Sequence, residues 1–148
     1  MSNKSKGANA ERELYQIFID NMYRAVRVAG SGMMENTSCD LIAGKIGAKY
    51  SIECKATKSK YKYITKEQIS DFIVFSEIFG LTPIIAIKFN RQGWFFLSPK
   101  ELEASKSKDF DGAQKSDSEK ISDNTGKYWS ISLEQAKAKG KRFAQMFG

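Results

Sequence analysis

Two acidic residues and a lysine in the first half of the chain have types and spacing suited to phosphate chemistry. Asp40 is followed, after twelve intervening residues, by Glu53, and Lys55 lies two residues further on. If the two segments pair as a hairpin, two carboxylates and one ammonium group converge within a few ångströms. Such carboxylates repel each other, and a divalent cation relieves the repulsion. The pattern favours an oxygen-ligated Mg²⁺ site beside a phosphate, where Lys55 would activate water or neutralise charge.

Glu11 is a third candidate ligand. It precedes Leu14 and Tyr15 by one turn, at the border of the apolar face of a predicted helix. Acidic residues are also common in the first turn of a helix, and we accept that interpretation for Glu13. For Glu11 we favour metal contact. The alternative for Asp40 and the Glu-x-Lys pattern is a solvated polar strand face, because this loose spacing is common.

The composition excludes several kinds of active site. The chain has 148 residues and no histidine, which excludes Ser-His-Asp and Cys-His nucleophiles, histidine-ligated zinc and histidine bases. Two cysteines are too few for a disulfide framework or a cysteine-rich zinc site, and they favour a reduced, cytoplasmic compartment. The apolar runs are too short to span a membrane, and the first residues lack the apolar core of a signal peptide.

The positive charge is concentrated in the first half of the chain. The net charge is +7, and residues 1–66 carry 12 basic and 6 acidic residues. This bias indicates a polyanionic partner, nucleic acid in preference to a membrane surface. The alternative is a lysine-rich surface that only keeps the protein soluble.

The hydrophobic pattern predicts one α/β domain over residues 1–148, with a central mixed β-sheet flanked by helices. Hydrophobic residues make up 41% of the chain, enough for a core. We expect a mobile polar loop over about 105–127. Thr65 and Gln68 form a predicted capping box. Helices are expected over 8–22, 65–80 and 133–147, and strands over 24–29, 40–44, 48–56, 83–89, 94–97 and 128–131.

Five sequence blocks carry a resemblance to a known family. In order they are Lys6-Gly7-x-x-x-Glu11-Arg12-Glu13-Leu14, Arg27-Val28-Ala29-Gly30-Ser31-Gly32, Asp40-Leu41-Ile42-Ala43-Gly44, Ile52-Glu53-Cys54-Lys55 and Glu67-Gln68. They resemble the archaeal Holliday junction resolvases, a branch of the PD-(D/E)xK nuclease superfamily, over about residues 5–100. One departure is Cys39, which replaces the proline that usually precedes the aspartate. We expect the Cys39 side chain to point toward the core.

The resemblance implies a restriction-endonuclease-like fold and a Mg²⁺-dependent homodimer that cuts four-way junction DNA. Mn²⁺ can replace Mg²⁺, and neither a membrane nor a small-molecule cofactor is implied. The implied metal ligands are Glu11, Asp40 and Glu53. The resemblance also assigns Lys55 as the catalytic lysine, Ser31 to an active-site loop, Arg12 and Arg27 to the phosphate backbone and Gln68 to the vicinity of the site. Capping alone would also explain Gln68.

Two further segments have open interpretations. Lys58, Lys60 and Lys62 alternate with Ser59, Tyr61 and Tyr63, which fits either a DNA-facing ribbon or a solvated edge. The surplus aromatic residues of the later strands and of the last helix are candidates for a dimer interface: Phe89, Trp94, Phe96, Phe143 and Phe147. The alternative functions are a related nuclease acting on duplex or flap DNA and a non-catalytic basic DNA-binding protein.

Overall fold

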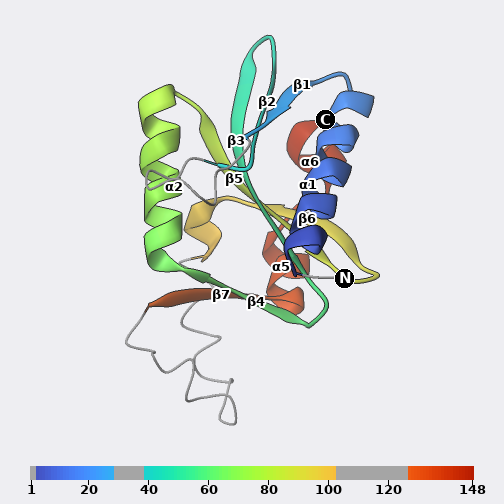
Figure 1. Cartoon of the computed structure of the whole chain (residues 1–148), viewed down its shortest axis with the longest axis vertical. Helices are drawn as coiled ribbons and strands as arrows, with labels where there is room; N and C mark the ends of the chain where they lie inside the picture. Colours follow the sequence, from blue (N-terminus) through green and yellow to red (C-terminus); the bar gives the residue numbers. More distant parts are fainter. Residues whose placement is uncertain (1–2, 29–38, 103–126) are drawn as a thin grey trace.

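A computed structural model describes residues 3–28, 39–102 and 127–148 of the chain. The central sheet of this part has five strands in the order β1-β2-β3-β5-β6. Only β3 and β5 run parallel, and the other neighbours are antiparallel. The mixed sheet and its flanking helices confirm the predicted fold class (Figure 1). The strands are β1 (Arg24–Arg27), β2 (Leu41–Lys45), β3 (Ala48–Thr57), β5 (Thr82–Phe89) and β6 (Gly93–Leu97).

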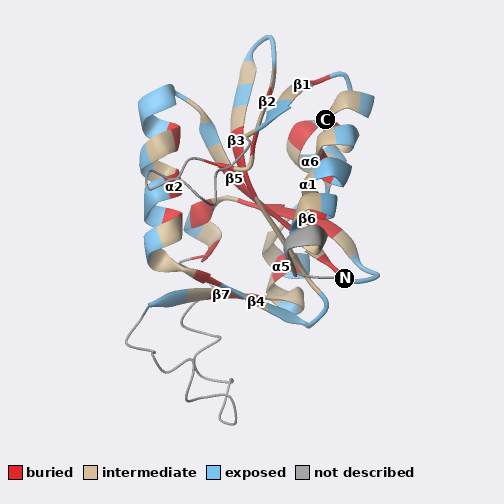
Figure 2. Cartoon of the chain, viewed as in Figure 1, coloured by how far each residue is buried: buried red, intermediate tan, exposed pale blue. Residues whose placement is uncertain are grey.

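Helices cover both faces of the sheet. Helix α1 (Asn3–Asp20) packs through Leu14 and Phe18 on one face, and α2 (Lys66–Phe79) packs through Ile69 and Phe72 on the other. Figure 2 shows the buried residues between these layers. The first helix therefore begins before the predicted residue 8. Glu11 and Glu13 lie beyond its first turn, so the helix-start interpretation of Glu13 is wrong.

A second, two-stranded sheet lies outside the central one. It joins β4 (Tyr61–Thr65) to β7 (Tyr128–Ser132) in antiparallel register. This second sheet adds to the predicted central one, and no strand was predicted at β4. The chain turns away after β3 because the hydroxyl groups of Thr57 and Ser59 both donate to the Tyr61 carbonyl, at 3.2 and 2.7 Å. These two hydrogen bonds close a turn over residues 57–61, so that β4 does not continue in the direction of β3.

The end of the chain forms two helices where one was predicted. Helix α5 (Leu133–Lys139) stops before Gly140, and α6 (Phe143–Phe147) follows. Lys141 exchanges two backbone hydrogen bonds with Phe96, 2.8 and 2.9 Å long. Pairing with β6 thus interrupts the helix. Its predicted apolar stripe is nevertheless used in the core, where Phe147 is buried and Phe143 packs at the border.

The proposed interface residues of the later strands are core residues. Phe89, Trp94 and Phe96 are all buried, as is Phe147. The prediction that they form a dimer interface is wrong, because the central sheet is covered on both faces and needs apolar side chains on both.

Cys39 is buried, as expected. Ser31 and the predicted loop, except Lys127, lie outside the described residues. No helix of the described residues is long and apolar enough to cross a membrane.

Candidate active site

The site lies beside the first residue of β2, where β3 continues beyond the residues that pair with β2. The first residue of β2, Leu41, pairs with Ile52, so the following residues of β3 have no partner on that strand. Asp40 occupies the place of the missing partner. Its backbone N–H donates to the Ile52 carbonyl at 3.0 Å, and its Oδ2 accepts the backbone N–H of Cys54 at 2.8 Å. The end of the β2–β3 ladder therefore fixes the Asp40 carboxylate against the middle of β3.

Glu53 lies on the face of β3 that α2 covers. Only 6% of the Glu53 surface is exposed to solvent. Its Oε2 accepts a hydrogen bond of 2.9 Å from Gln68 Nε2 and lies 3.6 Å from Lys55 Nζ. The hydroxyl groups of Ser51 and Ser76, 2.6 Å apart and buried, hold the same face of β3 against α2. The predicted hairpin thus brings Asp40, Glu53 and Lys55 together.

Gln68 serves the site through its side chain and the helix through its backbone. Thr65 Oγ1 accepts the Gln68 backbone N–H at 3.1 Å, which confirms Thr65 as the N-cap of α2. The Gln68 side-chain amide donates to Glu53, and the Gln68 side chain does not accept the Thr65 backbone N–H as a complete capping box requires. The capping-box prediction is therefore half right. The Gln68 side chain serves instead as a donor that orients a buried carboxylate.

The electrostatics of this pair favour a cation. Burial and then the nearby Asp40 carboxylate raise the pKa of Glu53, Lys55 and Gln68 act in the opposite direction, and the net value is about 8. Burial also raises the pKa of the Cys54 thiol, and the charges of Asp40, Glu11 and Glu53 add to that effect. The three predicted acids therefore surround Cys54. A buried carboxylate beside a second one is stabilised in its charged form by a divalent ion.

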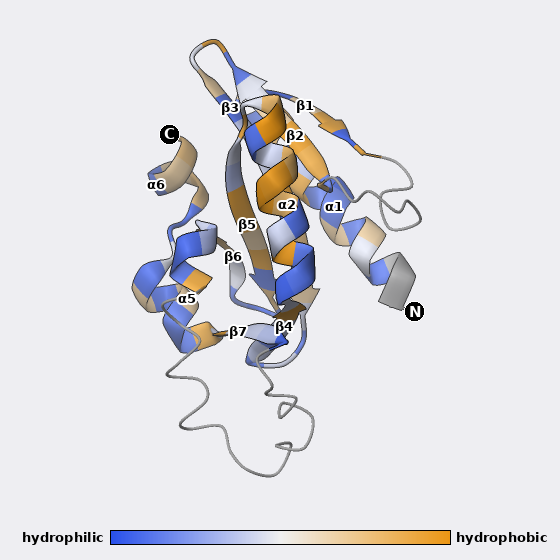
Figure 3. Cartoon of the chain, turned by 90° about the vertical axis from the view of Figure 1, so that its left-hand side faces the viewer, coloured by the Kyte–Doolittle hydropathy of each residue, from blue (hydrophilic) through white to orange (hydrophobic). Residues whose placement is uncertain are grey.

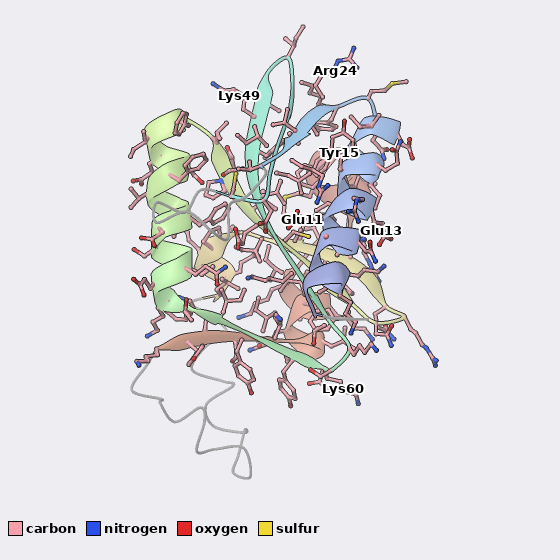
Figure 4. All side chains as sticks on the ribbon, in the orientation of Figure 1. Glu11, Glu13, Tyr15, Arg24, Lys49 and Lys60 are labelled. Atoms are coloured by element: carbon pink, nitrogen blue, oxygen red, sulfur yellow. The ribbon has the colours of Figure 1, made fainter. Side chains whose placement is uncertain are left out.

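Glu11 reaches this region from α1. Glu13 lies on the other side of the helix in Figure 4 and is ion-paired with Lys88 of β5, whereas Glu11 lies on the side toward β3. Its Oε1 pairs with Arg27 Nη2 at 3.1 Å. Among the described residues, no three histidine, cysteine, aspartate or glutamate side chains are arranged as a ready metal site. The donors nevertheless fit a hard divalent ion such as Mg²⁺, because they are carboxylate oxygens placed close enough to repel each other.

The predicted DNA-binding residues separate into different surroundings. Arg12 is exposed and bonds to Asn9 on its own helix at 2.8 Å, whereas Arg27 is paired with Glu11. Lys60 is exposed at the turn before β4. Lys62 is half-buried on the inner face of β4, where burial and then the Lys55 charge lower its pKa. Lys62 therefore lies near Lys55.

Lys58 lines a cavity that the sequence analysis missed. The cavity has a volume of about 190 Å³ and lies between α1 and the ends of β3 and β5. Its basic lining residues are Lys6, Lys58 and Lys88, and Lys88 is paired with Glu13. Lys6 opens the first sequence block and could have been found there. The sequence near Lys88 does not predict that it lines this cavity, and the sequence near Cys54 does not predict that its backbone N–H binds Asp40. Both contacts depend on how the strands pair.

Comparison with known proteins assigns the chain to a family. The family model described as archaeal Holliday junction resolvase matches residues 2–127. Crossover junction endodeoxyribonuclease Hjc of Methanocaldococcus jannaschii is 42% identical over 94 residues, which are 64% of this chain and 66% of that protein. Hjc of Archaeoglobus fulgidus is 30% identical over 145 residues, which are 98% of this chain and 97% of that protein.

The fold agrees with this assignment. A solved structure of Archaeoglobus fulgidus Hjc, a Holliday junction resolvase from an archaeal hyperthermophile, matches with a TM-score of 0.75 at 23% identity. The match covers 96% of this chain and 100% of that one, so the similarity extends over the central sheet and its helices. The family model and the Archaeoglobus relative both cover more than half of the sequence. The chain therefore belongs to the archaeal Holliday junction resolvase family.

Proposed function

We propose that this chain is an endonuclease that resolves four-way DNA junctions by hydrolysing phosphodiester bonds, in recombination and repair. The observation that carries the proposal is a cluster beside the part of β3 that extends beyond β2, formed by Asp40, Glu53, Lys55 and Gln68. The chain that carries this cluster is a member of the resolvase family. A protein that only bound DNA would gain nothing from two carboxylates there, since they repel phosphate. We place the enzyme in the cytoplasm of an archaeal or virus-infected cell.

Asp40 and Glu53 are the residues that would hold Mg²⁺, or Mn²⁺ in its place. Such an ion, when bound, stabilises negative charge on the phosphate and makes its bound water more acidic. Asp40 is already oriented by the Cys54 amide and Glu53 by Gln68. These bonds hold the oxygens in place before substrate arrives. Glu11 would complete the donor set on exchanging its present partner, Arg27.

The basic residues have complementary roles in this proposal. Lys55 Nζ orients and helps deprotonate the attacking water, or neutralises charge that develops on the phosphate. Arg12 and Arg27 contact the phosphate backbone on either side, and Arg27 becomes available when Glu11 binds the ion. Lys58, Lys60 and Lys62 extend the positive surface along the chain that follows β3. Ser31 is assigned to the site by resemblance alone.

The apolar outer face of α2 supports a homodimer. Val74, Ile78 and Phe79 are exposed, with Ile78 at 74%, and Phe75 packs on Phe79 with ring centroids 4.7 Å apart. Figure 3 shows these hydrophobic residues gathered in the half of α2 nearest Gly80. A four-way junction is close to twofold symmetric, and one chain supplies one cluster of acids. A second copy on this face would provide the second cut.

The decisive experiment compares a four-way junction with a linear duplex of the same arms, each incubated with Mg²⁺. We expect paired cuts in opposed strands of the junction only. Asp40→Ala should abolish cleavage while junction binding persists, because binding depends on lysine and arginine. Glu67→Ala, at an exposed position in the first turn of α2, is the matched control. Cutting of the duplex at the same rate would favour the related nuclease, and binding without cutting would favour the DNA-binding protein.

A further inference from the structure

The two-stranded sheet presents three tyrosines on its outer face. Tyr61 and Tyr63 alternate along β4 with residues that point inward. Tyr128 of β7 pairs with Thr65, which places it on the same side. Ile64 and Ile131 on the opposite side are buried in the core. The three tyrosines, called the tyrosine face below, are 48, 42 and 39% exposed in the order Tyr61, Tyr63, Tyr128.

The neighbours of these tyrosines leave much of the rings accessible. The residues directly opposite Tyr61 and Tyr63 are Ser132 and Ser130, which are too small to cover an aromatic ring. Two residues apart on a strand, the tyrosines are about 6.7 Å from each other. That distance equals about two stacking layers of roughly 3.4 Å each, the space needed for a base beside each ring. The contacts of this sheet with the core come from its inner face, through Ile64 and Ile131.

Lysines lie at both ends of the tyrosine face. At one end the Lys66 backbone N–H bonds to the Lys127 carbonyl at 2.8 Å, and at the other the Leu133 N–H bonds to the Lys60 carbonyl at 2.8 Å. Figure 4 shows Lys60 at its end of the ribbon. The acidic residues nearby are Glu67 and Glu134, which start the helices that follow β4 and β7. Accessible aromatic rings between cations are the usual means of holding unpaired nucleic acid.

We propose that the tyrosine face binds unpaired nucleotides of the DNA substrate, with bases stacked on the rings and phosphates on Lys60 and Lys127. The proposal rests on the proposed function, which supplies the DNA. Lys62, on the inner face of the same strand, is directed toward Lys55. The tyrosine face therefore lies on the opposite side of the ribbon from the catalytic cluster. It holds nucleotides beyond the scissile phosphate, in a strand released from pairing at the branch point.

The test is the binding of a single-stranded oligothymidylate of about ten nucleotides that contains one 2-aminopurine, whose fluorescence falls on stacking. The double variant Tyr61→Ser and Tyr63→Ser should bind at least tenfold more weakly than the natural chain and lose the quenching, because each stacked ring contributes about 1–3 kcal/mol. The matched variant Tyr61→Phe and Tyr63→Phe should bind and quench as the natural chain does. The melting temperature of each variant checks that it is folded.

Salt dependence separates stacking from charge. The serine variant should weaken binding equally at every salt concentration, whereas Lys60→Gln should reduce the slope of log affinity against log salt. Equal binding by the serine and natural chains would overturn the proposal, as would a phenylalanine variant as weak as the serine one. Junction cleavage by the natural chain is measured in parallel. If the natural chain quenches the fluorescence but does not cleave the junction, the proposed function alone is refuted. If it cleaves the junction but the serine variant binds the oligonucleotide as tightly, the proposed role of the tyrosine face alone is refuted.

Discussion

Replacement of Glu53 by glutamine should make the metal-free protein more stable at alkaline pH. In the folded protein the pKa of Glu53 is about 8, against 4.5 for an ordinary glutamate, chiefly because the group is buried. Below about pH 4.5 both the folded and the unfolded chain carry the proton, so Glu53 does not make the free energy of unfolding change with pH. Between the two values the unfolded chain releases its proton first, and the free energy of unfolding falls as pH rises.

The size of the effect follows from the two pKa values. They differ by about 3.5, and each pH unit corresponds to about 1.4 kcal/mol, so the full loss is on the order of 5 kcal/mol above about pH 8. Glutamine has the same shape and can still accept the Gln68 hydrogen bond, but it carries no charge. Glu53→Gln should therefore match the natural chain near pH 4 and exceed it by several kcal/mol near pH 9.

The assay is urea unfolding in EDTA at a series of pH values, followed by tryptophan fluorescence. Glu67→Gln, at an exposed position of α2, is the control and should follow the natural chain. Mg²⁺ added near pH 8 should restore much of the stability of the natural chain and little of that of Glu53→Gln, because the ion binds the charged carboxylate. A natural chain that is as stable as Glu53→Gln at every pH would show that Glu53 is charged and hydrated, and would refute the reasoning.

Three further outcomes are expected. Lys55→Gln should extend the pH-dependent loss of stability to higher pH and make it larger in the same unfolding series, because removal of the Lys55 charge raises the pKa of Glu53 in the folded chain only. Thr65→Ala should lower the free energy of unfolding by about 1 kcal/mol through loss of the α2 cap, and Thr65→Ser should retain it. Ile78→Glu should give monomers in sedimentation at micromolar concentration and nicked rather than linear product from a plasmid-borne junction, whereas Glu77→Gln on the same exposed turn should give dimers and linear product.

Strand β3 was predictable because its signals are local. Polar and apolar residues alternate along the strand expected over 48–56, and the structure places Cys54 on one face and Glu53 with Lys55 on the other. The spacing between Asp40 and Glu53 allowed a hairpin, and β2 and β3 form one. The end of α2 was equally readable, since Gly80 adopts the left-handed conformation that glycine favours, with φ of 68°.

The missed features depend on residues far apart in the chain. β4 pairs with β7 across more than sixty residues, and no turn between them marks the pairing. The same holds for Lys141, whose bonds to Phe96 divide the last helix. The aromatic residues of β6 were misassigned because a strand covered on both faces reads as a continuous apolar run, which sequence alone does not distinguish from an exposed interface.

The two readings of Gln68 show why a local signal can be correct and incomplete. The pattern Thr65-x-x-Gln68 predicts a capping box, and its backbone half is present. The reciprocal bond would stabilise only the first turn of α2. Directed at Glu53 instead, the same amide orients a carboxylate that burial keeps protonated when no ion is present. A side chain at a helix start that serves a buried acidic group and leaves the capping box incomplete is the expected sign of a site that gives up stability for function. That exchange supports Glu53 as the centre of the active site.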